Sequence, residues 1–209
     1  MNMKSIIKDA LILCLITIIA GGCLGLVYEI TKDPIAQAKE DAKQKAYSEV
    51  FVGAEVSAFN KVEAVSVDDM NSWITAAGIE KDLVNEVMIA VDGSNKTVGA
   101  AFNMTAKDGF GGNIQIVVGI MKDGKINKIS ILSISETPGL GMKATEDSFK
   151  NQFDGKPASE LKVVKTDAAA DTDVQAISGA TITSKAVTKC VNSAVVVFNK
   201  LVEGGVVGE

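Results

Sequence analysis

The hydroxyl-rich run at residues 178–184 has the residue types and the position needed to hold a phosphate group. It lies just ahead of residues 185–201, where apolar side chains recur at spacings of three and four and predict an amphipathic helix. A helix start carries unpaired N–H groups and a partial positive charge, and both favour anions. Within the run, Thr183 and Ser184 are residue types that commonly cap a helix. The sequence therefore predicts an anion site at this helix start.

Thr181 is the hydroxyl that this arrangement would place beside a bound phosphate. Ser178 and Gly179 precede it and give a flexible approach, because glycine tolerates positive φ and close backbone contact. The residue types thus place an alcohol and an anion site together. The residue types alone also fit simple helix capping, which is the ordinary role of Ser and Thr at a helix start.

A second candidate segment is a Pro-Gly turn at the end of a predicted strand. Proline fixes φ and the following glycine can adopt positive φ, which suits a tight, specific turn. Gly141 would let the backbone approach a flat ligand closely. The segment also fits a plain connection between a strand and a helix. Its residues are Glu136, Thr137, Pro138, Gly139, Leu140 and Gly141.

The composition excludes several kinds of chemistry. The chain has no histidine, which excludes Ser-His-Asp catalysis and histidine-based metal sites. Its three cysteines, Cys14, Cys23 and Cys190, are not spaced as CxxC pairs, so this chain alone cannot build a zinc or iron–sulfur site. The net charge of −5 and the lack of a basic patch argue against a nucleic-acid partner. We therefore expect no catalytic side chain and no metal in this chain.

An uncharged apolar stretch at residues 10–28 is long enough to cross the ~30 Å core of a bilayer as a helix. Two lysines precede it, and the positive-inside rule then places the N-terminus in the cytoplasm and the rest of the chain outside. We interpret residues 1–32 as a retained membrane anchor, with a transmembrane helix at about 10–30. A cleaved signal peptide and a lipoprotein attached at Cys23 are the alternatives.

The region after the anchor predicts an α+β domain. Apolar and β-branched residues over 84–91, 97–105, 114–121 and 125–135 predict strands, and Asp-Gly pairs between them predict hairpin turns. Strands joined by short turns form an antiparallel sheet, and helices at both ends would flank it.

The predicted organisation after the anchor has three parts. Residues 33–83 form a helical linker and the start of the soluble domain, and Pro34 is placed near a helix N-terminus. Residues 84–202 form the domain core, and residues 203–209 form a glycine-rich, flexible tail.

Three of these segments resemble motifs of a known family. Ser-Gly-Ala-Thr at residues 178–181, followed by Ile-Thr-Ser, resembles the flavinylation motif of the G subunit of the Rnf electron-transport complex. It is also similar to that of the C subunit of the sodium-translocating NADH:quinone reductase. The string at 136–141 resembles a family motif near the flavin ring, and Gly-Phe-Gly-Gly at 109–112 resembles the family's glycine-aromatic loop. Gln175 stands where many members carry Asp.

The resemblance implies an FMN-binding domain over residues 84–202, with the FMN phosphate joined to Thr181 as a phosphoester. A separate flavin transferase would attach it. The resemblance also implies cofactor contacts from the rest of both motifs, namely Ser178, Gly179, Ala180, Thr183, Ser184, Glu136, Thr137, Pro138, Gly139, Leu140 and Gly141.

By the same resemblance, the chain is a membrane-anchored electron-transfer subunit of an Rnf-type complex, which couples electron flow between ferredoxin and NAD to translocation of Na⁺ or H⁺. Such a redox subunit is not catalytically complete alone, and its partners are the integral and peripheral subunits of the complex. The expected location is the cell membrane, with one pass and the soluble domain on the extracytoplasmic side. The alternatives are a flavoprotein subunit of a sodium-translocating NADH:quinone reductase, a tethered flavin redox sensor, and a cofactor-free tethered binding protein.

Overall fold

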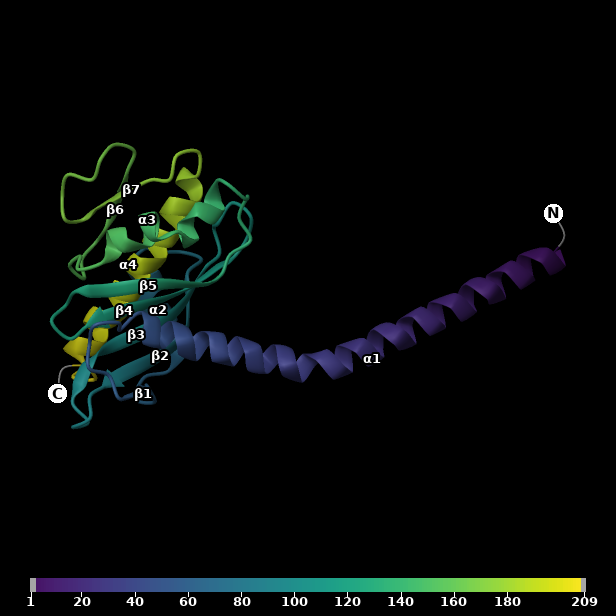
Figure 1. Ribbon diagram of the computed structural model, residues 1–209, viewed down its shortest axis with the longest axis horizontal. Coiled ribbons are helices and arrows are strands. Elements are labelled where there is room, and N and C mark those ends of the chain that lie inside the picture. Colours follow the sequence, from purple (N-terminus) through teal and green to yellow (C-terminus); the bar gives the residue numbers. More distant parts are fainter. Residues whose placement is uncertain (1–2, 208–209) are drawn as a thin grey trace. The chain divides into compact units, whose positions relative to one another are not determined.

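The computed structural model of the protein describes residues 3–207 (Figure 1). The chain separates into two units, one ending at Lys43 and the other beginning at Gln44. The first unit consists of most of α1, a helix that spans Met3–Glu49. The second unit contains the sheet and the remaining helices, and it confirms the predicted α+β class.

Helix α1 contains the apolar stretch that the sequence predicts to span a membrane. Its segment Ile6–Glu49 includes an 18-residue window with a mean hydropathy of 2.7, and the helix is long and apolar enough to cross a membrane. The sequence predicted a helix start near Pro34, but α1 runs through this proline. Proline removes one N–H bond from the helix, and the residues after it are mostly Ala, Lys, Gln and Glu, which are strong helix formers.

The second unit is built on a five-stranded antiparallel sheet whose strands are hydrogen-bonded in sequence order. Four of these strands match the predicted ones closely, and the short first strand lies within residues 33–83, the predicted helical linker and start of the soluble domain. The strands are β1 (Ala58–Lys61), β2 (Leu83–Val91), β3 (Thr97–Ala106), β4 (Ile114–Met121) and β5 (Ile126–Ser133).

The helices and a small parallel strand pair complete this unit. The helices are α2 (Val67–Ala76), α3 (Asp147–Lys150) and α4 (Thr181–Glu203), with two 3₁₀ turns at Gly141–Thr145 and Asn151–Phe153. The parallel pair is β6 (Lys162–Val164) with β7 (Asp173–Gln175).

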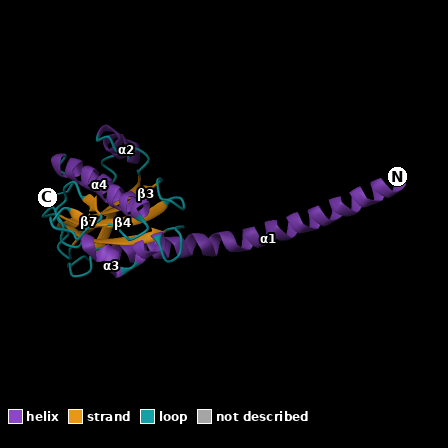
Figure 2. Cartoon of the chain, turned by 90° about the horizontal axis from the view of Figure 1, so that it is seen from above, coloured by secondary structure: helices purple, strands orange, loops and turns teal. Residues whose placement is uncertain are grey.

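One face of the sheet packs against α4 and α2, which lie on the same side of it in Figure 2. This is the main core, because alternate residues of β3 and β4 meet the apolar stripe of α4 here. Phe102 of β3 meets Phe198 of α4 edge to face, with ring centroids 6.3 Å apart. The packing fixes the axis of α4 across the middle of the sheet, and therefore fixes where the start of α4 lies.

The opposite face of the sheet holds a smaller core that includes the last turn of α1. Tyr47 and Val50 are fully buried there, against residues of β3 and β4 that alternate with those of the main core. The Tyr47 hydroxyl donates a hydrogen bond to Glu86 Oε2 at 2.8 Å. Residues from Gln44 onward therefore belong to the globular unit, whereas the rest of α1 does not.

The segment after α4 turns back onto the core, although the sequence predicted a flexible tail at 203–209. Gly205 adopts a φ of +71°, and the N–H of Val206 returns to the carbonyl of Leu201 at 2.9 Å. Val207 then packs into the main core with 1% exposure. This is the usual glycine-dependent ending of a helix, in which an apolar residue closes over the last turn. Residues 208–209 lie outside the described part of the chain.

We expect Gly119→Ala to lower the free energy of unfolding of the globular unit by about 1–3 kcal/mol, because the added methyl overpacks a closed core. A Cβ at Gly119 would lie 2.6 Å from the carbonyl oxygen of Val50. Urea unfolding of the full chain in detergent can be followed by Trp73, because the single tryptophan lies in the globular unit.

The matched control is Gly93→Ala, in which the added Cβ would lie 3.5 Å from Ser57 Oγ, an ordinary contact. This change should move the stability by less than about 0.5 kcal/mol. Equal losses in the two variants would contradict the close packing of β4 on the end of α1.

Candidate functional site

Helix α4 begins at Thr181, four residues earlier than the sequence predicted. The predicted caps, Thr183 and Ser184, lie inside the first turn, and the N-cap is Ala180, which makes no side-chain cap bond. The N–H of Ser184 is bonded to the carbonyl of Ala180 at 3.0 Å. The three preceding N–H groups, those of residues 181–183, therefore have no hydrogen-bond partner within the helix. The anion site stays a prediction, and Thr181 belongs to the helix rather than preceding it.

Thr183 and Ser184 do not cap because their side chains turn inward. Both are buried, with exposures of 1% and 0%. The Ser184 hydroxyl accepts the N–H of Ile177 at 2.9 Å and donates to the Ala180 carbonyl at 3.0 Å. It thereby fastens the loop before α4 to the first turn. Within that loop Gly179 has a φ of +76°, and the N–H of Ala180 closes a tight turn onto Ile177.

Glu136 is the buried acceptor that joins three separate segments at this place. Its exposure is 5%, and it follows the end of β5. Its Oε2 accepts the hydroxyl of Thr183 at 3.0 Å, and its Oε1 accepts the N–H of Gly111 at 3.1 Å. The start of α4, the segment after β5 and the glycine-rich loop between β3 and β4 therefore meet at one carboxylate.

The predicted Pro-Gly turn is present at residues 137–140. Gly139 has a φ of +76°, and the N–H of Leu140 is bonded to the carbonyl of Thr137 at 3.1 Å. The structure gives a reason for glycine at residue 141 that the sequence did not reveal: a Cβ there would lie 2.6 Å from Glu136 Oε2 and 2.7 Å from Thr183 Oγ1. The space that a side chain at residue 141 would need is filled by the Glu136 carboxylate and the Thr183 hydroxyl.

A cleft of about 340 Å³ opens where these segments meet. Three of its lining side chains are apolar and exposed: Phe110 (67%), Leu140 (43%) and Ile182 (53%). Large exposed apolar side chains are otherwise sparse in the described part of the globular unit. Eight of the twelve predicted site residues also line the cleft: Glu136, Thr137, Leu140, Gly141, Gly179, Ala180, Thr181 and Thr183.

The other four predicted residues, Ser178, Ser184, Pro138 and Gly139, do not line the cleft but shape the turns and the helix start beside it. The prediction omitted Phe110 and Ile182 as site residues. A signal for both was present, because each is a large apolar residue flanked by glycines or threonines in a segment that does not have the pattern of a core element.

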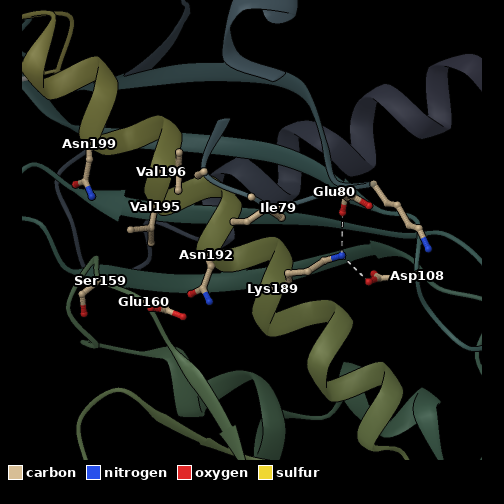
Figure 3. A pocket seen from close by; sticks show the side chains of 13 residues that line it. Ile79, Glu80, Asp108, Ser159, Glu160, Lys189, Asn192, Val195, Val196 and Asn199 are labelled. Carbon is tan, nitrogen blue, oxygen red and sulfur yellow. Dashed lines mark hydrogen bonds and ion pairs between the residues drawn. The ribbon is translucent and has the colours of Figure 1, made fainter. Parts of the chain in front are cut away.

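A second cluster lies farther along α4, beside a larger cavity of about 740 Å³ (Figure 3). Lys189 Nζ forms ion pairs with Asp108 Oδ2 and, at 3.4 Å, with Asp82 Oδ1, and it donates to the carbonyl of Glu80 at 3.1 Å. Asp82 is 4% exposed and also accepts the hydroxyl of Ser193 at 2.8 Å. The sequence reasoning missed this cluster. Its only signal is a lysine within the otherwise uncharged middle of α4.

Burial and charge act in opposite directions on this cluster. Burial raises the pKa of Asp82 above its ordinary value, although Ser193 and Lys189 partly oppose the shift. Burial lowers the pKa of Lys189, but the two carboxylates raise it by more, so the lysine stays charged. Burial also raises the pKa of the neighbouring Cys190 thiol well above its ordinary value, so this fully buried cysteine behaves as a small core residue.

Comparison with known proteins identifies the family. The family described as FMN-binding domain matches residues 109–196, and the one described as RnfG N-terminal region matches residues 1–50. The G subunit of the proton-translocating ferredoxin:NAD(+) oxidoreductase complex of Clostridium ljungdahlii is 38% identical over 191 residues, covering 91% of this chain and 89% of the relative. The chain belongs to the family of Rnf complex G subunits.

Two further comparisons agree with this family. The G subunit of the Na(+)-translocating ferredoxin:NAD(+) oxidoreductase complex of Acetobacterium woodii is 36% identical over 201 residues, covering 95% of this chain and 94% of the relative. The crystal structure of the C subunit of the Na(+)-translocating NADH-quinone reductase from Parabacteroides distasonis covers 79% of this chain and 94% of that chain. Its TM-score is 0.56 at 18% identity, so this likeness concerns the fold.

The residues of the cleft fit FMN, the cofactor that the matched domain is named for. The exposed apolar side chains of Phe110, Leu140 and Ile182 suit a flat aromatic ring, which gains from leaving water. The free N–H groups at the start of α4 suit a phosphate. The matched range of 109–196 includes every residue that lines the cleft.

We expect the stability difference between the native chain and Asp82→Asn to depend on pH. Because the folded-state pKa of Asp82 is raised above 3.8, the folded protein binds this proton more tightly than the unfolded chain does. The native chain should therefore lose stability relative to Asp82→Asn as pH rises from about 4 through the folded pKa, and the difference should then level off.

Urea midpoints of both chains, followed by tryptophan fluorescence at several pH values between about 3 and 8, test this expectation. Asp92→Asn is a control whose stability difference should change with pH in the opposite direction. Hydrogen bonds from the Lys96 and Ser94 N–H groups lower the pKa of this exposed carboxyl. A stability difference for Asp82→Asn that stays constant with pH would contradict the raised pKa.

Proposed function

We propose that this chain is the membrane-anchored flavin subunit of an ion-translocating ferredoxin:NAD⁺ oxidoreductase complex. The observation that carries the proposal is the cleft at the start of α4, where a threonine hydroxyl, free backbone N–H groups and exposed apolar side chains meet. The names of the two relatives support the reaction, since both belong to ferredoxin:NAD(+) oxidoreductase complexes. One of these complexes translocates protons and the other Na⁺, so the proposal covers either ion.

Thr181 is the proposed attachment point, through an ester between its hydroxyl and the FMN phosphate. It lines the cleft from the first position of α4 and is half-buried, so its hydroxyl can be reached from the cleft. The N–H groups of Ile182 and Thr183 follow it at the positive end of the helix dipole, where a phosphodiester charge is stabilised by about 0.3–1 kcal/mol.

The cofactor supplies reversible electron transfer, and the chain supplies attachment, orientation and exclusion of water. Phe110, Leu140 and Ile182 form the apolar rim of the cleft and exclude water from one side of a bound ring. Glu136 contributes indirectly, because it fixes the loop that carries Phe110 to the first turn of α4. The remaining predicted residues shape the two tight turns that bound the cleft.

We propose that a separate flavin transferase attaches the cofactor. The hydroxyl oxygen of Thr181 would bond to the riboflavin-side phosphorus of FAD, the bond between the two phosphates would break, and AMP would leave. The hydroxyl proton needs a base. The chain has no histidine, and both oxygens of Glu136 already accept hydrogen bonds, so we assign the base to the transferase.

The proposed location is the cell membrane, with residues 1–32 as the anchor and the globular unit on the extracytoplasmic side. The apolar part of α1 supports the span, and the lysines ahead of it support a cytoplasmic N-terminus. The partners would be the integral and peripheral subunits of the same complex. A quinone-reductase subunit shares the fold alone at 18% identity, which makes it the weaker alternative.

We expect Thr181→Val to abolish covalent flavin, because the ester oxygen is lost while the volume of the side chain is kept. The native chain, purified from its own membrane, should weigh one FMN less one water more than its polypeptide, and its denatured band should fluoresce under blue light. Thr137→Val is the matched control, since it removes another hydroxyl that lines the same cleft. Flavin-sized mass on Thr181→Val would place the attachment elsewhere.

We expect a cysteine introduced by Ser94→Cys to react with a membrane-impermeant maleimide in right-side-out vesicles. Ser94 is exposed in the turn between β2 and β3, whereas the native Cys190 is fully buried. The counterpart is Asn2→Cys, which should react only after the vesicles are opened. The reverse pattern would invert the proposed orientation.

A further inference from the structure

We infer that Asp108 is a positioning residue for the flavin cleft, and that its ion pair with Lys189 holds the loop 108–112 so that Phe110 stays over the cleft. The inference rests on the proposed function, because it gives Phe110 a role against a bound flavin. It assigns a task to the Lys189 cluster, which the sequence did not reveal and whose hydrogen bonds and ion pairs, among the described residues, reach no residue of the predicted site.

The loop connects β3, which ends at Ala106, to β4, which begins at Ile114. Phe110 stands in its middle, lines the cleft and is 67% exposed, so packing alone does not fix it. An exposed aromatic side chain on a glycine-rich loop keeps its place only if the backbone on both sides is held.

One hydrogen bond or ion pair to a side chain holds the loop on each side of Phe110, in addition to the close packing of Gly109 and Gly111. On the far side, the N–H of Gly111 donates to Glu136 Oε1 at 3.1 Å. On the near side, Asp108 Oδ2 pairs with Lys189 Nζ. Gly109 itself packs closely, because a Cβ there would lie 2.8 Å from Glu136 Oε1. Without the pair to Lys189, the backbone just ahead of Gly109 would lose its ionic anchor.

The two tethers lead to the same helix. Glu136 is bonded to Thr183 in the first turn of α4, and Lys189 lies two turns after Thr181, about 12 Å along the axis. The loop that carries Phe110 is therefore tied to the helix that carries the proposed attachment point. The position of Phe110 relative to Thr181 then depends on both tethers.

The balance of charges in the cluster determines which substitution removes the tether without endangering the fold. Two carboxylates, those of Asp82 and Asp108, share one ammonium group, that of Lys189. Removal of Lys189 would leave two partly or fully buried carboxylates without a counter-charge, which endangers the fold. Removal of Asp108 leaves a balanced pair of Asp82 with Lys189, so the tether is lost while the core keeps its charge balance.

Glu80 and Cys190 do not change this charge balance. Glu80 contributes only its backbone carbonyl to Lys189, and the Cys190 thiol is fully buried and protonated beside it. Asp154→Ala is the matched control for Asp108→Ala. Asp154 pairs with Lys128 at 3.0 Å, and its side-chain exposure of 32% equals that of Asp108. The pair of Asp154 with Lys128 lies outside the loop 108–112, and neither of its two residues lines the cleft.

The test measures how easily iodide quenches the flavin fluorescence of the full, flavin-loaded chain in detergent. Phe110→Ala and Asp108→Ala should each raise the quenching constant by about twofold, because the aromatic cover over one face of the ring is lost or displaced. Asp154→Ala should leave it unchanged. Asp108→Glu should restore most of the native value, because the longer carboxylate can still reach Lys189.

The double variant Asp108→Ala with Phe110→Ala separates positioning from a merely structural effect. If Asp108 acts through Phe110, the double variant should quench no more than Phe110→Ala alone. Additive effects, or native quenching in Asp108→Ala with flavin attached, would overturn the inference.

If the purified chain carries no flavin, the proposed function is wrong, but the tether can still be tested. Hydrogen exchange of the amides at residues 109–112 in Thr181→Ala reports on the loop without the cofactor. Addition of Asp108→Ala should speed this exchange at least several-fold, because one of the two anchors of the loop is lost. Unchanged exchange would overturn the tether itself.

Discussion

The site depends on one buried carboxylate. Glu136 accepts a hydroxyl from Thr183 and an N–H from Gly111, and these three residues are brought together from segments far apart in the chain. A buried acceptor left without partners costs about 1–3 kcal/mol, and a charged one costs more. The carboxylate is therefore stable at this place only while all three segments keep their positions. This condition explains the glycine at Gly141, where any side chain would occupy the space of the carboxylate.

The sheet and α4 create the geometry that this carboxylate completes. Alternation along β3 and β4 gives the sheet two apolar faces, and the larger core lays α4 across one of them. The start of α4 then meets the ends of β3 and β5, where the chain leaves the sheet in two loops. Tight turns with positive φ at Gly139 and Gly179 bring the backbone back toward the helix start. The cleft is thus set by core packing and turn geometry, and its polar groups are fixed by hydrogen bonds.

The sequence predicted strands β2 to β5, the turns between them and most of the residues that line the cleft, because local patterns carry those features. The apolar and β-branched runs of β2 to β5 and the Asp-Gly turns depend on neighbours in the chain. The start of α4 was misplaced because Thr183 looks like a cap, and only the distant Glu136 shows that its hydroxyl points inward. The cluster around Lys189 was missed for the same reason, since Asp82 and Asp108 approach it only in the folded chain.

The openness of the cleft gives a reason why an ester to Thr181 would help to retain a flavin. The cleft is open, and Phe110, Leu140 and Ile182 remain largely exposed around it. An open apolar cleft with a few N–H groups covers only one side of a ligand, so binding without a covalent bond would be weak. A covalent bond removes that limit, because retention no longer depends on enclosure. The ring can then stay accessible on one face for electron exchange, while the loop tethers and the turn at residues 137–140 orient the other.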